Sequence, residues 1–202
     1  QLVDRLEQRL GVYRTQVLEF LLAVLAHQDD LGLTADPQFQ FANQRHGGLR
    51  IQVLAIALAH QLQADGVKKG DRVALIMRNL PEWPVAFYAA ASLGAIVTPL
   101  NAWWTGPELE YGLTDSGAKV VIMDAERHER LTEHLPNCPD LVRAYVSRAR
   151  EEIAHPLVVT VESVLGLAND WHKLPDRPLP DVEILPDDDA TIFYTSGTTG
   201  KP

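Results

Sequence analysis

A segment of small polar residues near the carboxyl end of the sequence has the composition of a phosphate-binding loop. Residues 195–202 are Thr-Ser-Gly-Thr-Thr-Gly-Lys-Pro, and they follow the apolar run 190–194. Glycines let a backbone approach a ligand closely, consecutive N–H groups can form an anion-binding nest, and hydroxyls can donate to phosphate oxygens. Lys201 adds a positive charge. Surface turns use similar residues, but this concentration directly after an apolar strand favours a polyphosphate site.

The loop differs from the two commonest nucleotide-binding motifs. A Walker A loop has four residues between its glycines and Ser or Thr after its lysine. Here Gly197 and Gly200 are only three positions apart, and Pro202 follows Lys201. The proline argues against a helix that begins immediately after the lysine, as a Walker loop requires. The Rossmann spacing G-x-G-x-x-G is absent as well.

Alternating strands and helices are predicted upstream of this loop. Short apolar runs predict strands buried on both faces, and apolar residues at helical spacing predict the helices between them. The expected strands are 72–77, 95–98, 119–123, 141–146, 157–161 and 190–194, and the expected helices are 51–64, 79–94, 105–116 and 125–135. This alternation predicts an α/β fold, a mainly parallel sheet flanked by helices on both faces. Such sheets bind ligands beyond the carboxyl ends of their strands.

Capping residues mark several helix ends. Thr105 and Glu108 have the spacing of a capping box, and Pro107 lies in the first turn, where a helix tolerates proline. Asp124 can accept a hydrogen bond at the N-terminus of the helix that follows it. Gly117 stands where glycine commonly ends a helix. These signals support the predicted boundaries.

The chain divides into four segments by composition. We expect an N-terminal helical and irregular segment, an α/β subdomain, a linker rich in Pro and Asp, and a last strand with the start of the loop: 1–50, 51–174, 175–189 and 190–202. Within the first segment, residues 2–25 have helical spacing interrupted near Gly11, and 33–50 is polar and predicted to be irregular. Residues 195–202 are expected to be mobile, because glycine loses much backbone entropy when ordered.

Composition excludes several classes of protein. The 202 residues hold 18 Lys and Arg against 27 Asp and Glu, a net charge of −9, which disfavours non-specific nucleic-acid binding. The longest apolar stretch, 17–26, is too short for a bilayer span of ~20 residues; peripheral membrane association stays open. Cys138 is the single cysteine, so no internal disulfide can form, which favours a cytoplasmic location. Its expected role is that of a small apolar core residue.

Three other groups of residues could do chemistry but have simpler interpretations. The acidic run 187–189 is expected to be a solvated turn rather than a cation site. His128 and His134 are six positions apart, a spacing that does not place them on one helical face. We therefore predict no metal site. Trp103 and Trp104 are adjacent and must point different ways, one into the core and one partly exposed; a role at an acyl or coenzyme A entrance is the alternative.

The sequence resembles the adenylate-forming enzymes, which include acyl-CoA synthetases, luciferases and adenylation domains of peptide synthetases. The run 194–202, Tyr-Thr-Ser-Gly-Thr-Thr-Gly-Lys-Pro, is similar to the family's phosphate-binding motif, and the resemblance covers about 51–202. Further similar stretches are 66–74, 79–83, 93–101 and 108–119. Residues 101–105, Asn-Ala-Trp-Trp-Thr, look most like those of fatty-acid-CoA ligases. The first fifty residues fit the family poorly.

The resemblance implies an ATP-dependent acyl-CoA ligase that activates a carboxylic acid, in the first instance a fatty acid, as acyl-AMP and then forms the coenzyme A thioester with the help of Mg²⁺. The residues that would cradle the phosphates are Thr195, Ser196, Gly197, Thr198, Thr199, Gly200 and Lys201. By the same resemblance, the catalytic residues lie beyond Pro202. We therefore interpret the chain as an N-terminal fragment that is inactive alone.

Two alternatives remain at this point. The chain could belong to an amino-acid- or aryl-acid-activating enzyme of the same superfamily. It could also be a non-catalytic α/β interaction module whose last loop is an ordinary turn. The oligomeric state is not indicated by the sequence.

Overall fold

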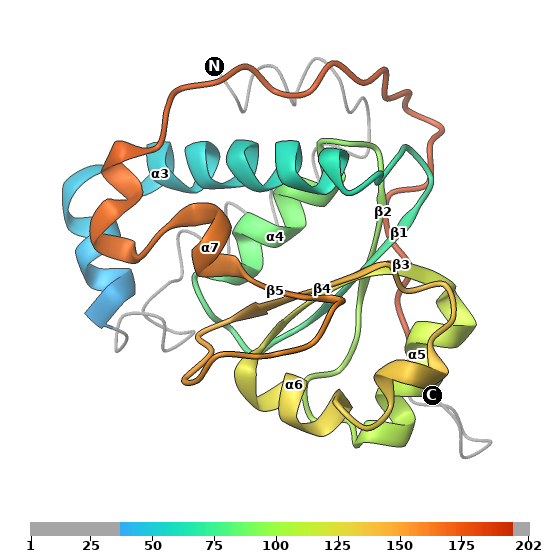
Figure 1. The fold of residues 1–202 in the computed structure, drawn as a ribbon. Helices are drawn as coiled ribbons and strands as arrows, with labels where there is room; N and C mark the ends of the chain where they lie inside the picture. Colours follow the sequence, from blue (N-terminus) through green and yellow to red (C-terminus); the bar gives the residue numbers. More distant parts are fainter. Residues whose placement is uncertain (1–36, 196–202) are drawn as a thin grey trace.

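The centre of the protein is a parallel sheet of five strands. The structure, a computed structural model, describes residues 37–195. Its strands follow the order β2-β1-β3-β4-β5, and all adjacent pairs are parallel (Figure 1). Their bounds are β1 Arg72–Ile76, β2 Ile96–Pro99, β3 Ala118–Asp124, β4 Arg143–Ser147 and β5 Val158–Thr160. The predicted fold class is therefore confirmed.

Helices cover both faces of the sheet. The helices α3, α4 and α7 lie on one face, and α5 and α6 lie on the other (Figure 1). Their bounds are α3 Pro37–Ala64, α4 Glu82–Ala91, α5 Gly106–Ser116, α6 Ala125–Leu131 and α7 Val161–Leu165, with short 3-10 helices η3 Leu135–Asn137 and η4 Ala168–Lys173. None of the helices in residues 37–195 is both long and apolar enough to cross a bilayer.

Strands β1, β3 and β4 each contribute to two separate hydrophobic clusters, one on each face of the sheet. Val73 and Leu75 of β1 pack beneath α3 and α4, whereas Ala74 and Ile76 pack against the α5 side. All four side chains are at most 1 % exposed. Because both faces are buried, the strands are continuous apolar runs without polar alternation, as expected for a parallel sheet.

The predicted capping residues have their expected roles. The Glu108 carboxylate accepts hydrogen bonds from the Thr105 N–H (2.7 Å) and hydroxyl (2.8 Å) and forms a capping box at the start of α5. Asp124 accepts from the Arg127 N–H at 3.1 Å and caps α6. Gly117 ends α5 with φ +61°, a left-handed conformation that favours glycine. Local sequence therefore determines these boundaries.

Two helix predictions require correction. Residues 33–50 were expected to be irregular, but α3 begins at Pro37. Proline suits a first helical turn because its missing N–H has no partner there in any case. The two glycines at 47 and 48 weaken a helix by ~1 kcal/mol each relative to alanine, but the helix continues into its buried second half. In contrast, α6 ends at Leu131 rather than at 135, because Pro136 has no N–H to donate to the carbonyl oxygen of Thr132 and its ring would clash with that carbonyl in a continued α-helix.

The segment expected to be a buried strand at 190–194 forms a single bridge instead. Thr191 pairs in parallel with Val97, through hydrogen bonds of 2.9 and 3.0 Å between the backbone of Val97 and that of Ala190 and Ile192. The segment thus lies beside β2 in the predicted direction, but Phe193 is 70 % exposed. The expectation of burial was wrong because, among the described residues, the segment has a neighbour on one side only.

The predicted linker 175–189 runs along α3 without helix or strand (Figure 1). His60 Nε2 lies 2.9 Å from the Pro178 carbonyl oxygen, and Lys69 Nζ lies 2.5 Å from Asp188 Oδ2. Residues 2–25 and 196–202, for which a helix and a mobile loop were predicted, lie outside the described residues.

Candidate functional site at the carboxyl edge of the sheet

The segments that follow four of the parallel strands come together at the carboxyl edge of the sheet. Arg78 follows β1, Trp103 lies in the connection after β2, Asp124 ends β3 and Arg148 follows β4. Parallel sheets bind ligands at this edge. The ligand usually lies between two adjacent strands whose connections lead to opposite sides of the sheet. Here that place lies between β1 and β3, because β2 and β4 extend the sheet in opposite directions.

The entry to the predicted phosphate-binding loop is held at the α5 side of this fold. The Tyr194 ring lies edge-on to Trp104, with centroids 5.8 Å apart and planes at 79°. The Tyr194 hydroxyl donates to Asp115 at 2.7 Å, and burial, followed by this hydrogen bond, raises the pKa of the phenol. Thr195 is exposed. It is the only predicted site residue within the described residues, since 196–201 lie outside them.

An exposed indole and two guanidinium groups gather near the ends of β1 and β3. Trp103 is 64 % exposed, and the Arg78 guanidinium carbon lies 4.7 Å from the centroid of its ring. The corresponding carbon of Arg127 lies 6.0 Å from it. Cations over an indole face are attracted by the negative charge of the ring face. The prediction that the two adjacent tryptophans differ in exposure is confirmed, because Trp104 is partly buried and packs against the core on the α5 side.

A buried ion pair organises this edge. Arg127 Nη1 donates to both carboxylate oxygens of Asp124 at 3.1 Å, and both side chains are almost fully buried. Asp124 also accepts from the Arg78 N–H at 3.3 Å, and Arg127 Nε donates to the Ala102 carbonyl oxygen at 2.9 Å. The pair thus joins the chain segments that follow β1, β2 and β3.

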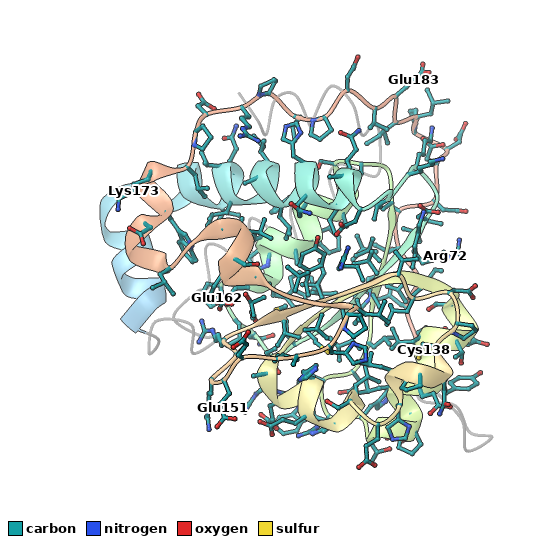
Figure 2. The ribbon with its side chains drawn as sticks, in the orientation of Figure 1. Arg72, Cys138, Glu151, Glu162, Lys173 and Glu183 are labelled. Carbon is teal, nitrogen blue, oxygen red and sulfur yellow. The ribbon has the colours of Figure 1, made fainter. Side chains whose placement is uncertain are left out.

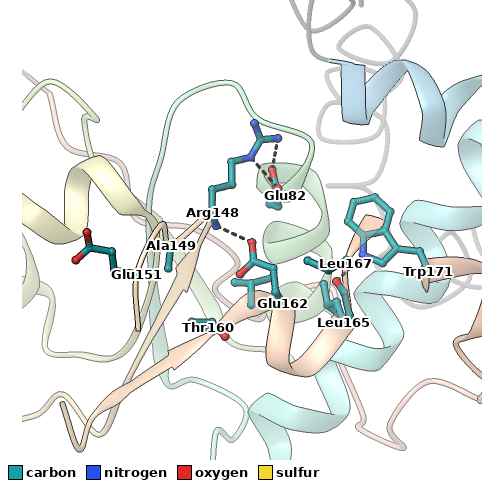
Figure 3. A pocket seen from close by; sticks show the side chains of 11 residues that line it. Glu82, Arg148, Ala149, Glu151, Thr160, Glu162, Leu165, Leu167 and Trp171 are labelled. Carbon is teal, nitrogen blue, oxygen red and sulfur yellow. Dashed lines mark hydrogen bonds and ion pairs between the residues drawn. The ribbon is translucent and has the colours of Figure 1, made fainter. Parts of the chain in front are cut away.

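Two cavities open at this edge, and Arg148 lines both. One, of about 440 Å³, lies over Arg78, Asp124 and Arg127. The other, of about 550 Å³, combines the acidic groups of Glu82 and Glu162 with an apolar wall that includes Trp171 (Figure 3). Buried Arg127 Nη2 has no hydrogen-bond partner among the described residues.

Two further candidates from the sequence, Cys138 and His134, have structural surroundings that explain them. Cys138 is 6 % exposed and packs on the α5 side of the sheet (Figure 2), and burial, with a smaller effect of Glu110, raises its thiol pKa to about 11. His134 Nδ1 lies 2.6 Å from Glu110 Oε2. In residues 37–195, no three acidic, histidine or cysteine side chains are grouped in a way that could hold a metal ion.

Sequence analysis missed the charged residues at the edge. Arg78, Arg127 and Arg148 were not singled out, because an isolated arginine after a strand has no motif of its own. Their position was the available signal: Arg78 lies one residue, and Arg148 two residues, beyond the carboxyl end of a predicted strand, where ligands of parallel sheets bind.

These features define a parallel α/β protein with a polar, partly cationic site at the carboxyl edge. Residues 49–202 match the family described as AMP-binding enzyme. The chain therefore belongs to the AMP-binding enzyme family, in agreement with the resemblance to adenylate-forming enzymes.

The chain is similar in sequence to enzymes named as acid–CoA ligases or synthases. The chain is 38 % identical over 157 residues to the long-chain-fatty-acid–CoA ligase FadD13 of Mycobacterium tuberculosis, covering 76 % of this chain and 27 % of that protein. It is 31 % identical over 163 residues to a feruloyl-CoA synthase of an Amycolatopsis species, covering 78 % and 28 %. The chain thus spans about a quarter of the length of these relatives.

Solved structures show the same fold. The anthranilate CoA ligase AuaEII, solved in complex with anthranoyl-AMP, superposes with a TM-score of 0.63 at 27 % identity, covering 75 % of this chain and 27 % of that one. The R395G mutant form of coronafacic acid ligase from Pectobacterium brasiliense gives a TM-score of 0.61 at 24 % identity, covering 72 % of this chain and 27 % of that one, and supports the fold alone.

Proposed function

We propose that this chain is part of an ATP-dependent ligase that converts a carboxylic acid, in the first instance a fatty acid, to acyl-AMP and then to its coenzyme A thioester. The observation that carries the proposal is the family match over residues 49–202, which includes residues 195–202, the start of the predicted phosphate-binding loop. The identity of 38 % to a long-chain-fatty-acid–CoA ligase supports a fatty acid as the substrate.

The reaction requires two anions to be brought together. The acid's carboxylate attacks the α-phosphorus of ATP in line, and pyrophosphate leaves. Neutralisation of charge and correct placement are therefore more important than a general base. Residues 195–201 would hold the leaving phosphates through hydroxyls, backbone N–H groups and Lys201. Mg²⁺ would supply further positive charge, and we assign it no ligand in the described residues.

The carboxyl edge would contribute binding rather than bond making. Trp103 offers an exposed aromatic face, and Arg78 offers positive charge beside it. ATP and coenzyme A both carry an adenine ring and phosphates, which suit such groups. The catalytic residues are proposed to lie outside this chain, so we expect residues 1–202 alone to be inactive. The proposal includes a cytoplasmic location, which the single cysteine favours.

A second candidate is activation of an aromatic acid. Its support is the 31 % identity to feruloyl-CoA synthase and the 29 % identity to a rice 4-coumarate–CoA ligase. The two candidates differ in the acid pocket. They share the adenylation step and therefore the same role for residues 195–201.

The test is pyrophosphate exchange by the full-length enzyme with a panel of fatty, aromatic and amino acids. Exchange with fatty acids supports the first candidate, and exchange with ferulate-like acids supports the second. Thr195→Ala and Thr198→Ala should lower turnover, up to ~100- to 1,000-fold if each hydroxyl meets developing charge. Thr132→Ala is the control, because this hydroxyl at the end of α6 donates to the His128 carbonyl oxygen one turn earlier. Full turnover in both loop variants would contradict the proposed role of residues 195–201 in binding the phosphates of ATP.

A further inference from the structure

Arg148 has a backbone conformation that an arginine rarely adopts. Its φ is +59°, and it is the only residue other than glycine with positive φ among residues 37–195. This left-handed conformation strains any residue with a Cβ, and glycine would adopt it without that strain. Strained residues are enriched at functional sites, so an arginine in this conformation points to a role for its side chain.

The side chain pairs with a buried carboxylate. Arg148 Nε donates to Glu82 Oε1 at 3.0 Å, and Nη2 donates to Glu82 Oε2 at 3.1 Å. The Glu82 side chain is only 7 % exposed. Such a bidentate ion pair fixes the relative orientation of the two side chains in addition to pairing their charges. A lysine cannot reproduce this geometry.

The backbone of the same residue is held from another side. The Arg148 N–H donates to Glu162 Oε1 of α7 at 2.6 Å. Figure 3 shows Arg148 between Glu82 and Glu162, with dashed lines to both. One residue at the end of β4 thus connects the start of α4 with α7, although Glu82 is 66 positions away in the sequence.

Glu82 directly follows the loop 77–81, which crosses the carboxyl edge. Within this loop, the Arg78 N–H donates to Asp124 and the Arg78 guanidinium lies over Trp103. The loop is therefore held at two places: at Arg78 by Asp124, and at its far end by the pair of Glu82 with Arg148.

We propose that Arg148 is a positioning residue for the ligase reaction. It anchors the N-terminus of α4 to β4 and α7, and thereby holds the loop 77–81 and Arg78 in the arrangement that binds an adenosine-phosphate substrate, either ATP or coenzyme A. This inference rests on the proposed function. It assigns Arg148 no contact with the reacting atoms.

The test uses the full-length enzyme and variants chosen so that folding and positioning can be separated. Arg148→Gly alone would leave the Glu82 carboxylate buried without this partner, so the main variant is the double substitution Glu82→Gln with Arg148→Gly, which removes both charges and the strain. Arg148→Lys keeps the positive charge and loses the bidentate hydrogen bonding to Glu82. Arg177→Gly is the matched control, because Arg177 is exposed in the segment 175–189.

Three quantities are measured for each enzyme: Tm, the KM for ATP in pyrophosphate exchange without coenzyme A, and the KM for coenzyme A in the complete reaction. We expect the double variant to melt within ~3 °C of the wild type and to raise one of the two KM values at least ~5-fold, with kcat at saturation nearly unchanged. The substrate whose KM rises is the one that the loop binds. Arg148→Lys should give an intermediate KM, and Arg177→Gly should match the wild type.

A folded double variant with both KM values unchanged would overturn the inference and leave Arg148 as a structural residue. If the double variant does not fold, Arg148→Lys decides by the same KM criterion. A wild-type enzyme that exchanges pyrophosphate with none of the acids would contradict the proposed function itself. The two failures are therefore distinguishable.

Discussion

The backbone of Gly106 lies directly against the imidazole ring of His134. A Cβ on Gly106 would overlap His134 Nε2 and stand 2.6 Å from the Arg130 carbonyl oxygen. The ring cannot easily turn away, because its Nδ1 is 2.6 Å from Glu110 Oε2. The start of α5 and the turn after α6 therefore approach each other at a distance that only glycine allows.

Gly106→Ala should therefore destabilise the protein by ~1–3 kcal/mol, the usual penalty of overpacking a rigid contact. Gly112→Ala is the matched control, since its Cβ would meet only the side-chain tips of Leu100 and Trp104, at 2.9 and 3.0 Å. Alanine also has a helix propensity ~1 kcal/mol better than glycine, which offsets that crowding. Urea unfolding of both variants measures the difference; equal stabilities would contradict the close approach.

The thiol of Cys138 should resist modification in the folded protein. It is buried, and burial raises its pKa to about 11 from the ordinary 9.0, so at pH 8 only ~0.1 % is thiolate. Because the folded-state pKa is raised, the associated stability is fully present below pH 9 and is lost as the pH rises toward 11. Iodoacetamide at pH 8 should label Cys138 only after urea is added. Rapid labelling without urea would show that the thiol is accessible.

Glu110 should make the contact between α5 and η3 sensitive to acid. Hydrogen bonds from Asn137 and then from His134 lower the pKa of Glu110 below its ordinary 4.5. Since the folded-state pKa is lowered, the associated stability is present above pH 4.5 and is lost as the pH falls through the lowered value. Glu110→Gln should therefore reduce Tm at pH 7 and lose less Tm than the wild type on acidification. Glu133→Gln, at an exposed position nearby, should leave the Tm profile unchanged.

Trp103→Ala should affect substrate binding and leave stability nearly unchanged. The side chain is 64 % exposed, and exposed substitutions usually change stability by less than ~0.5 kcal/mol. In the full-length enzyme, loss of the aromatic face should raise the KM for ATP or coenzyme A several-fold. Leu185→Ala removes a side chain that is 50 % exposed in the segment 175–189 and serves as the control. Equal KM values in the two variants would exclude a binding role for Trp103.

Local sequence alone determined much of this fold. The strands were predictable because burial on both faces requires continuous apolar runs, and the ends of α5 and the start of α6 were predictable because Thr105, Gly117 and Asp124 act on backbone groups only a few residues away. The proposed phosphate-binding motif could be singled out for a similar reason, since its glycines and hydroxyls are close together in the chain.

Tertiary structure decided the features that depend on distant residues. The single bridge at Thr191 and the exposure of Phe193 follow from a position at the sheet edge, which an apolar run does not reveal. The site at the carboxyl edge depends on connections that return to the same side of a parallel sheet, so Arg78 meets Trp103 only after the fold has formed. Arg148 is the clearest case: its strain and its pairing with Glu82 exist only because topology places the end of β4 beside the start of α4.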